Sequence, residues 1–134
     1  MNVTSLLDAL VARNDDVLLL GGDGREVRAR EVVERAEQLR TLVPSSPDSV
    51  SPRIGVAMAN GPQLASTTLA TMAVATCAPL DPRGRDAELR DAVARLDLDA
   101  LVVDDPTGAA ALAAGKAGIG LLVAGPDGIA AASG

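Results

Sequence analysis

The sequence of 134 residues contains no phenylalanine, tyrosine, tryptophan or histidine, and Cys77 is its single cysteine. Without histidine, the chain cannot form a triad or dyad in which an imidazole activates a serine or cysteine nucleophile. Without aromatic rings, it has no platform on which the bases of single-stranded nucleic acid could stack. One cysteine also excludes an internal disulfide and a CxxC metal site.

Basic side chains are scarce: Lys and Arg number 12 against 18 Asp and Glu, and the net charge is −6. An acidic chain gains little from a phosphate backbone or an anionic membrane surface, so we expect neither nucleic acid nor membrane as a partner. The longest apolar runs, such as residues 17–20, are too short to span a bilayer. Residues 1–5 lack the features of a signal peptide, so we expect a cytoplasmic protein.

Apolar residues, which make up 48% of the chain, follow alternating helix and strand patterns. An apolar run, a glycine turn at residues 21–24 and a polar return predict an N-terminal β-hairpin. An amphipathic helix is expected over residues 29–43, with Arg35 on its polar face. The remaining pattern predicts a first helix near residues 6–11, helices at 63–75 and 86–96, an alanine-rich helix opened by Asp105 and Pro106, and strands at 54–59, 77–80, 100–103 and 119–124.

This order predicts an α/β fold, in which a parallel sheet carries helices on both faces and follows an N-terminal β-hairpin. We expect one domain over residues 1–134. Residues 125–134 are small and weakly patterned, and we expect them to form a weakly structured tail.

The glycine-rich segments do not match known phosphate loops. Lys116 is followed by Ala117, which breaks the GxxxxGK[ST] pattern. The GxGxxG pattern that starts at Gly118 fails because Val123 occupies its third glycine position. The glycines at 21–24 lie between two expected strands and lack a following helix N-terminus. We interpret all of these glycines as turns or helix stops.

Carboxylates occur in close pairs, of which Asp104 and Asp105 stand at the end of an expected strand. Such pairs are more typical of caps and solvated turns than of acid–base catalysis, which needs two carboxylates in different environments. Open α/β sheets bind ligands at the carboxyl ends of their strands. Candidates for substrate binding are therefore Asn60, Asp81 and Asp104, and no catalytic residue, cofactor-binding residue or metal ligand is assigned.

Two other features have ordinary explanations. Cys77 has no basic neighbour in the sequence to lower its pKa, and a buried, small apolar role is favoured. Arg83 and Arg85 could meet an anion, but a solvated loop after Asp81 and Pro82 is favoured.

Two stretches carry a family resemblance: RIGVAMANGPQ at residues 53–63 and CAPLDP at residues 77–82. They resemble the adenylate-forming (ANL) superfamily, which includes acyl-CoA synthetases, aryl ligases, luciferases and nonribosomal-peptide adenylation domains. The resemblance extends over residues 15–124, through Glu31-Val32, Glu88-Leu89 and the strand that ends at Asp104. Residues 75–80 are more similar to acyl-CoA and oxalyl-CoA synthetase-like members than to peptide-synthetase ones, so the resemblance is to an acyl-CoA synthetase or AMP-dependent ligase.

The departures from that family concern its chemistry. Val74 and Cys77 stand at a glycine and an aromatic position of the family pattern. The family's Ser/Thr/Gly-rich phosphate loop with its lysine, its ribose-binding acid, its magnesium glutamate and its catalytic lysine have no counterpart in this sequence. Family members convert ATP and a carboxylate into an acyl-adenylate and pyrophosphate, a step that needs cationic stabilisation of the phosphates. The resemblance therefore implies ATP and Mg only for a complete enzyme.

Three functional hypotheses follow. The chain is the N-terminal fragment of an acyl-CoA synthetase-like ligase, structural and not catalytic by itself, with the remainder of the ligase or a complementary chain as partner. Alternatively, it is a stand-alone interaction module that binds a partner or forms a homo-oligomer through an exposed face. A third hypothesis is a small nucleotide- or acyl-binding domain that uses the strand ends near Asn60, Asp81 and Asp104.

Overall fold

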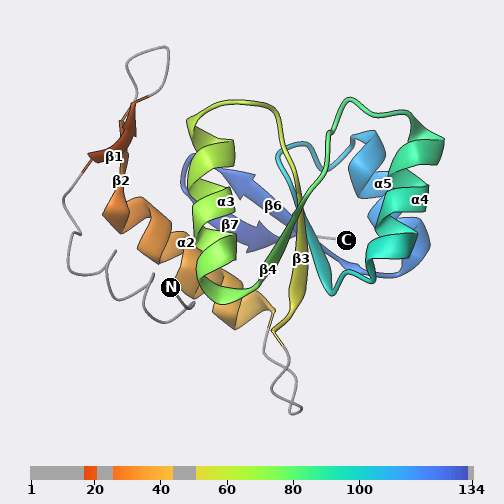
Figure 1. The fold of residues 1–134 in the computed structure, drawn as a ribbon, viewed down its shortest axis with the longest axis horizontal. Helices are drawn as coiled ribbons and strands as arrows, with labels where there is room; N and C mark the ends of the chain where they lie inside the picture. The colour runs from red at the N-terminus through yellow and green to blue at the C-terminus, as the bar shows by residue number, and fades with distance from the viewer. Residues whose placement is uncertain (1–16, 21–25, 44–50, 133–134) are drawn as a thin grey trace.

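The computed structural model of the chain describes residues 17–20, 26–43 and 51–132 (Figure 1). Helices and strands alternate after an opening pair of strands, as the sequence predicts. In chain order the elements are β1 (Val17–Leu20), β2 (Glu26–Arg28), α2 (Ala29–Leu42), β3 (Arg53–Ala57), α3 (Pro62–Val74), β4 (Thr76–Pro79), α4 (Asp86–Leu96), β5 (Ala100–Val103), α5 (Ala109–Ala117), β6 (Gly120–Gly125) and β7 (Gly128–Ala131).

The main sheet has five strands in the order β4-β3-β5-β6-β7. Its first four strands are parallel, with Ile54 of β3 opposite Cys77 of β4 and Ala100 of β5. β1 and β2 form a separate antiparallel pair. The expected α/β fold with a parallel sheet and an N-terminal hairpin is therefore confirmed.

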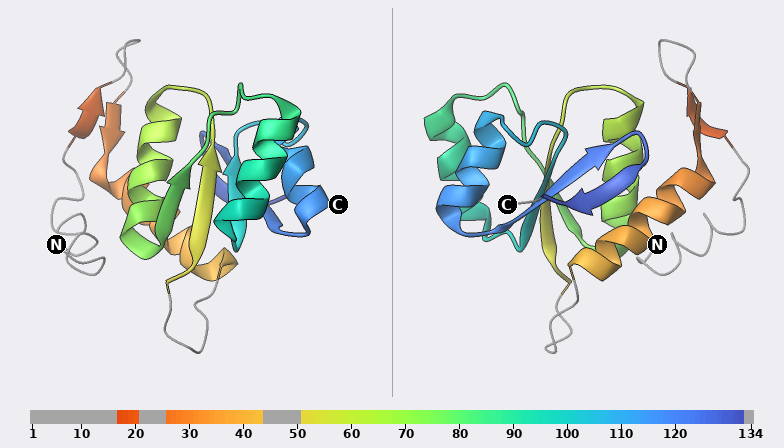
Figure 2. Two further views of the ribbon diagram at one scale, coloured as in Figure 1. Left: turned by 45° about the vertical axis from the view of Figure 1, so that its right-hand side comes forward. Right: turned by 180° about the vertical axis from the view of Figure 1, so that it is seen from behind.

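Helices cover both faces of the sheet (Figure 2). α2 and α3 lie on one side, and α4 and α5 lie on the other. Strand β5 shows why: Ala100 and Val102 belong to the core under α2 and α3, whereas Leu101 and Val103 belong to the core under α4 and α5. Alternate side chains of a strand point to opposite faces, so a strand that is apolar throughout needs cover on both faces.

The structure corrects the expected position of Arg35. Its side chain is 3% exposed, so it lies in the interior instead of on a polar face. On the helix it flanks the apolar stripe of Val32 and Ala36, and α3 packs over that flank. Arg35 Nη2 donates to Gln63 Oε1 and to the Gly125 carbonyl oxygen, both at 2.6 Å. These hydrogen bonds offset the cost of burying the guanidinium group.

The structure also corrects the expectation of a weakly structured tail at residues 125–134. In the described part of this segment, Gly128–Ala131 forms strand β7. β7 pairs antiparallel with β6, with Ala131 opposite Leu122 and Ile129 opposite Ala124. The strand is held from the other side by Gln38 of α2, whose Oε1 accepts a hydrogen bond from Ile129 N at 2.8 Å. This tertiary contact orders residues whose local pattern is weak.

The alanine-rich helix begins later than the sequence suggests. α5 starts at Ala109, because Asp105 caps a turn at Thr107 instead of opening the helix at Pro106. Its end at Gly118, with φ +73°, agrees with the expected glycine stop. The expected first helix near 6–11 and the turn at 21–24 lie outside the described residues.

The buried Arg35 predicts a large effect of a conservative change. Arg35→Lys keeps the charge but has a single donor nitrogen, which cannot serve Gln63 and Gly125 as Nη2 does and also reach Thr67 as Nη1 does, so we expect a loss of roughly 2–3 kcal/mol in unfolding free energy. Arg40→Lys, at an exposed position of the same helix, should change it by less than about 0.5 kcal/mol. Urea denaturation followed by far-ultraviolet circular dichroism measures both variants; equal losses would contradict this account.

Gly55 in β3 provides a second stability test. A Cβ added there would lie 2.7 Å from Leu98 Cδ1 and 2.8 Å from Leu101 Cδ1. Gly55→Ala must displace both packed methyl groups, so we expect a loss of roughly 1–3 kcal/mol. Gly115→Ala is the control, because this α5 position has open space and should gain about 0.5–1 kcal/mol. A neutral Gly55→Ala variant in the same urea titration would show that this core is loosely packed.

Candidate functional site

The three residues proposed as substrate-binding candidates lie together at the carboxyl ends of the parallel strands. Asn60, Asp81 and Asp104 follow strands β3, β4 and β5, and these strands are adjacent and parallel. All three are exposed at the carboxyl ends of the strands. Open α/β sheets bind ligands at this carboxyl end of their strands.

Two adjoining hollows lie at the carboxyl ends of these strands. The first, of about 550 Å³, lies between the ends of β3 and β4 and includes Asn60 and Asp81. The second, of about 300 Å³, lies beside the end of β5 and includes Asp104. Both are lined by Ala59, Pro82 and Arg83, so we treat them together as the strand-end crevice. The structure therefore places all three candidates around one crevice, although Asp104 lines a different part of it from the other two.

Asp104 has a structural contact within this crevice. Its Oδ2 accepts a hydrogen bond from Ala59 N at 3.0 Å, so it connects the end of β5 to the end of β3. Asp105, next to it, turns to Thr107 instead, and its Oδ1 accepts from both Thr107 N and Thr107 Oγ1. The two adjacent carboxylates thus have separate partners and do not form an acid–base pair.

Asp81 forms a compact turn with Arg83. Its Oδ1 accepts from Arg83 N at 2.9 Å and from Arg83 Nε at 3.2 Å, and its carbonyl oxygen accepts from Gly84 N. The backbone hydrogen bond, then the side-chain hydrogen bond, holds the pKa of the Asp81 carboxyl below its usual value. The side-chain hydrogen bond from Thr107, then the backbone hydrogen bond from the same residue, lowers the pKa of Asp105. A general acid needs a raised pKa, so neither group suits that task.

The segment that joins β3 to α3 fixes the position of Asn60. Gly61 is the N-cap of α3 and has φ +146°, a conformation that residues with a Cβ rarely adopt. Pro62 occupies the first helical turn, as the sequence suggests. Asn60 of this junction and the partly buried Leu64 of α3 both line the strand-end crevice.

The strand-end crevice does not fit a nucleotide triphosphate by itself. Its titratable groups are Asp81, Asp104, Asp105 and Arg83, and the Arg83 guanidinium is paired with Asp81. Negative charge therefore prevails where phosphates would need cations. In the part of the chain that the structure describes, no group of three or more His, Cys, Asp or Glu side chains could hold a metal ion.

Cys77 lies on β4, half-buried, against the core under α2 and α3. Burial raises the pKa of its thiol, which keeps it protonated. This agrees with the expected apolar role, although the side chain is only partly covered.

None of the helices in residues 17–20, 26–43 and 51–132 has the length and apolar character to cross a membrane.

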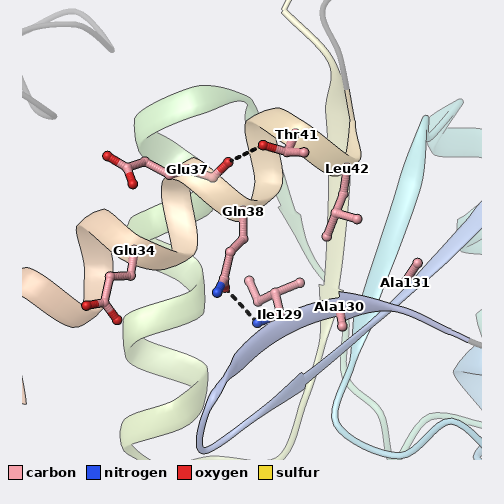
Figure 3. A pocket seen from close by; sticks show the side chains of 8 residues that line it. All are labelled: Glu34, Glu37, Gln38, Thr41, Leu42, Ile129, Ala130 and Ala131. Carbon is pink, nitrogen blue, oxygen red and sulfur yellow. Dashed lines mark hydrogen bonds between the residues drawn. The ribbon is translucent and has the colours of Figure 1, made fainter.

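Sequence reasoning missed one further hollow, which we call the α2–β7 groove (Figure 3). It has a volume of about 480 Å³ and lies between α2 and the edge strand β7. No local signal identifies it, because the weak pattern of residues 125–134 does not indicate a strand. The groove is lined by Glu34, Glu37, Gln38, Thr41, Leu42, Ile129, Ala130 and Ala131.

No family model and no curated protein matches the sequence. Among solved structures, MatB from Rhodopseudomonas palustris matches 95% of this chain with TM-score 0.65 and 23% identity. CmiS6 matches 97% of it with TM-score 0.65 and 18% identity. The N-terminal subdomain of Klebsiella oxytoca NpsA, in complex with 3-hydroxybenzoyl-AMSN, matches 81% with TM-score 0.58 and 22% identity.

The chain has the fold of the adenylate-forming enzymes. The expectation that the resemblance gave for the fold is thereby confirmed. The chain spans only a fraction of the adenylate-forming structures that it matches: 26% of MatB, 32% of CmiS6 and 28% of the NpsA subdomain.

The turn at Asp81 predicts a measurable titration effect. Arg83→Gln removes the ion pair but keeps the backbone N–H, so we expect the Asp81 pKa to rise part of the way to its usual value. The Asp105 pKa serves as the internal control and should not move. A pKa lowered by folding means that the stabilisation is present above the usual aspartate pKa and is lost as the pH falls through the lowered value. Carboxyl-carbon NMR titration measures both groups; an unchanged Asp81 pKa would refute the contact.

Proposed function

We propose that the chain is the N-terminal part of an ATP-dependent carboxylate-activating ligase of the acyl-CoA synthetase kind, structural and not catalytic by itself. The extent of the match is the observation that carries this proposal. Nearly the whole chain, 95–97%, superposes on MatB and CmiS6, yet it spans only 26–32% of their length. Almost all of this chain is matched, but only a small part of each ligase structure is. This supports the proposal that the chain is one portion of a larger molecule.

The chemistry of the strand-end crevice supports a non-catalytic role. Acyl-adenylate formation needs fixed cations or donors where charge develops on the phosphates. This chain has no phosphate-loop motif, and the crevice cation Arg83 is paired with Asp81. ATP and Mg therefore belong to the complete enzyme in this proposal, together with the residues that would hold them.

The partner in this proposal is the remainder of the ligase, or a complementary chain that supplies it. Asn60, Asp81 and Asp104 would then line the substrate side of the completed site, because they surround the crevice at the carboxyl ends of β3, β4 and β5. A cytoplasmic location, expected from the sequence, is part of the same proposal.

Pyrophosphate exchange tests the proposal. The purified 134-residue chain, given ATP, Mg and a panel of small carboxylates, should show no ATP–pyrophosphate exchange above the buffer control. Addition of the polypeptide encoded downstream of the Gly134 codon should restore exchange. Exchange by the chain alone would overturn the proposal, and so would a stop codon there with no Ser/Thr/Gly-rich loop and lysine encoded nearby.

A stand-alone interaction module is the second candidate, and the α2–β7 groove is the observation that favours it. The groove lies beside a strand that ends the sheet, where a further chain could add. A small nucleotide- or acyl-binding domain is less well supported, because the carboxylates of the strand-end crevice disfavour phosphate.

A further inference from the structure

The two edges of the main sheet differ in how they present their backbone groups. On β4, Thr76 N and Leu80 N donate hydrogen bonds toward β3. The backbone groups of the alternate residues Cys77 and Pro79 therefore point away from β3, toward the outer edge of the sheet. Pro79 has no N–H to offer, which protects this edge from pairing with another strand. β4 therefore has the protected edge.

The other edge, on β7, is more open. Ala132 N donates inward to Leu121 O at 3.0 Å, so Ile129 and Ala131 direct their backbone groups away from β6. Gln38 occupies the outward N–H of Ile129. Among the described residues, no strand pairs with the outward N–H and C=O of Ala131 or with the outward C=O of Ile129.

The surface beside this edge is shaped to receive side chains. In Figure 3, Gln38 and Leu42 of α2 point toward β7, and the α2–β7 groove of about 480 Å³ lies between the two elements. Ala130 and Ala131 are exposed and small, so an added strand would meet no bulky side chain there. The groove thus combines an apolar floor with unpaired backbone groups.

The charge of the groove limits its occupant. Glu34 and Glu37 lie along the α2 side and are exposed. Neither carboxylate belongs to the ion pairs Arg83–Asp81 and Arg95–Asp91. A second copy of the chain, with net charge −6, would bring the same carboxylates to the contact, which disfavours self-pairing.

We infer that the β7 edge and the α2–β7 groove bind an extended segment of a partner polypeptide whose side chains alternate between basic and apolar. The segment adds a strand to β7 through Ala131 N–H and C=O and the Ile129 C=O. Its apolar side chains pack on Leu42 and Ile129, and its basic side chains meet Glu34 and Glu37. This inference rests on the groove alone and does not depend on the proposed function.

Fluorescence anisotropy with a labelled octapeptide of alternating lysine and valine tests it on the full chain. We expect binding at low salt that weakens as ionic strength rises. An octapeptide of alternating glutamate and valine should not bind. Equal binding of the two peptides, or no binding of the lysine peptide, would overturn the inference.

Variants separate the two contacts. Ala131→Pro removes one outward N–H and leaves the pairing with β6 intact, so affinity should fall about 2- to 10-fold. Glu34→Gln with Glu37→Gln should weaken binding roughly 2- to 20-fold and reduce its salt dependence. Glu88→Gln, on the exposed surface of α4 across the sheet, is the matched control and should bind as the parent does.

Folding and self-association are measured in parallel. Circular dichroism and urea denaturation confirm that each variant is folded before its affinity is interpreted. Hydrogen exchange of the Ala131 amide should slow when the lysine peptide binds, which a purely electrostatic contact would not produce. A dimer in sedimentation equilibrium that Ala131→Pro dissociates would make a second copy the occupant and overturn the inference.

Discussion

The buried guanidinium of Arg35 is the contact that joins α2, α3 and the end of β6, three parts of the chain that are far apart in sequence. It donates to Gln63 on α3 and to the Gly125 carbonyl at the end of β6, 90 positions away. A charged group in the interior is tolerated only when its donors are satisfied, so its partners cannot drift apart without a large cost. One turn further along α2, Gln38 bonds to Ile129 and fixes β7.

This anchoring decides which edges of the molecule are open. With α2 held against the β6–β7 turn, the α2–β7 groove has a defined shape, and β7 ends the sheet as an ordered strand. The opposite edge is limited by Pro79, and the carboxyl ends of the parallel strands form the acidic strand-end crevice. The molecule therefore offers one acidic strand edge and one acidic crevice, and neither suits phosphate.

Much of the fold could be predicted because its signals are local. The amphipathic repeat placed α4 at residues 86–96 and the apolar run placed β5 at 100–103, both as the structure has them. The gathering of Asn60, Asp81 and Asp104 at one edge followed from parallel strands alone. The burial of Arg35 could not be predicted, because an arginine beside an apolar stripe normally faces water until a second helix covers it. Strand β7 was missed for a related reason, since alanine and glycine have little preference for a strand until β6 and Gln38 supply hydrogen bonds.

The sequence by itself determined the order of helices and strands, the sheet with cover on both faces, and the absence of histidine-based and aromatic-based chemistry, because these depend on composition and short-range periodicity. Only the tertiary structure decided the partners of Asp104 and Asp105, which lie side by side in the chain but bond to different groups. It also decided the open β7 edge and the α2–β7 groove. These features arise from contacts between residues distant in sequence, such as Gln38 and Ile129, and no local pattern encodes such contacts.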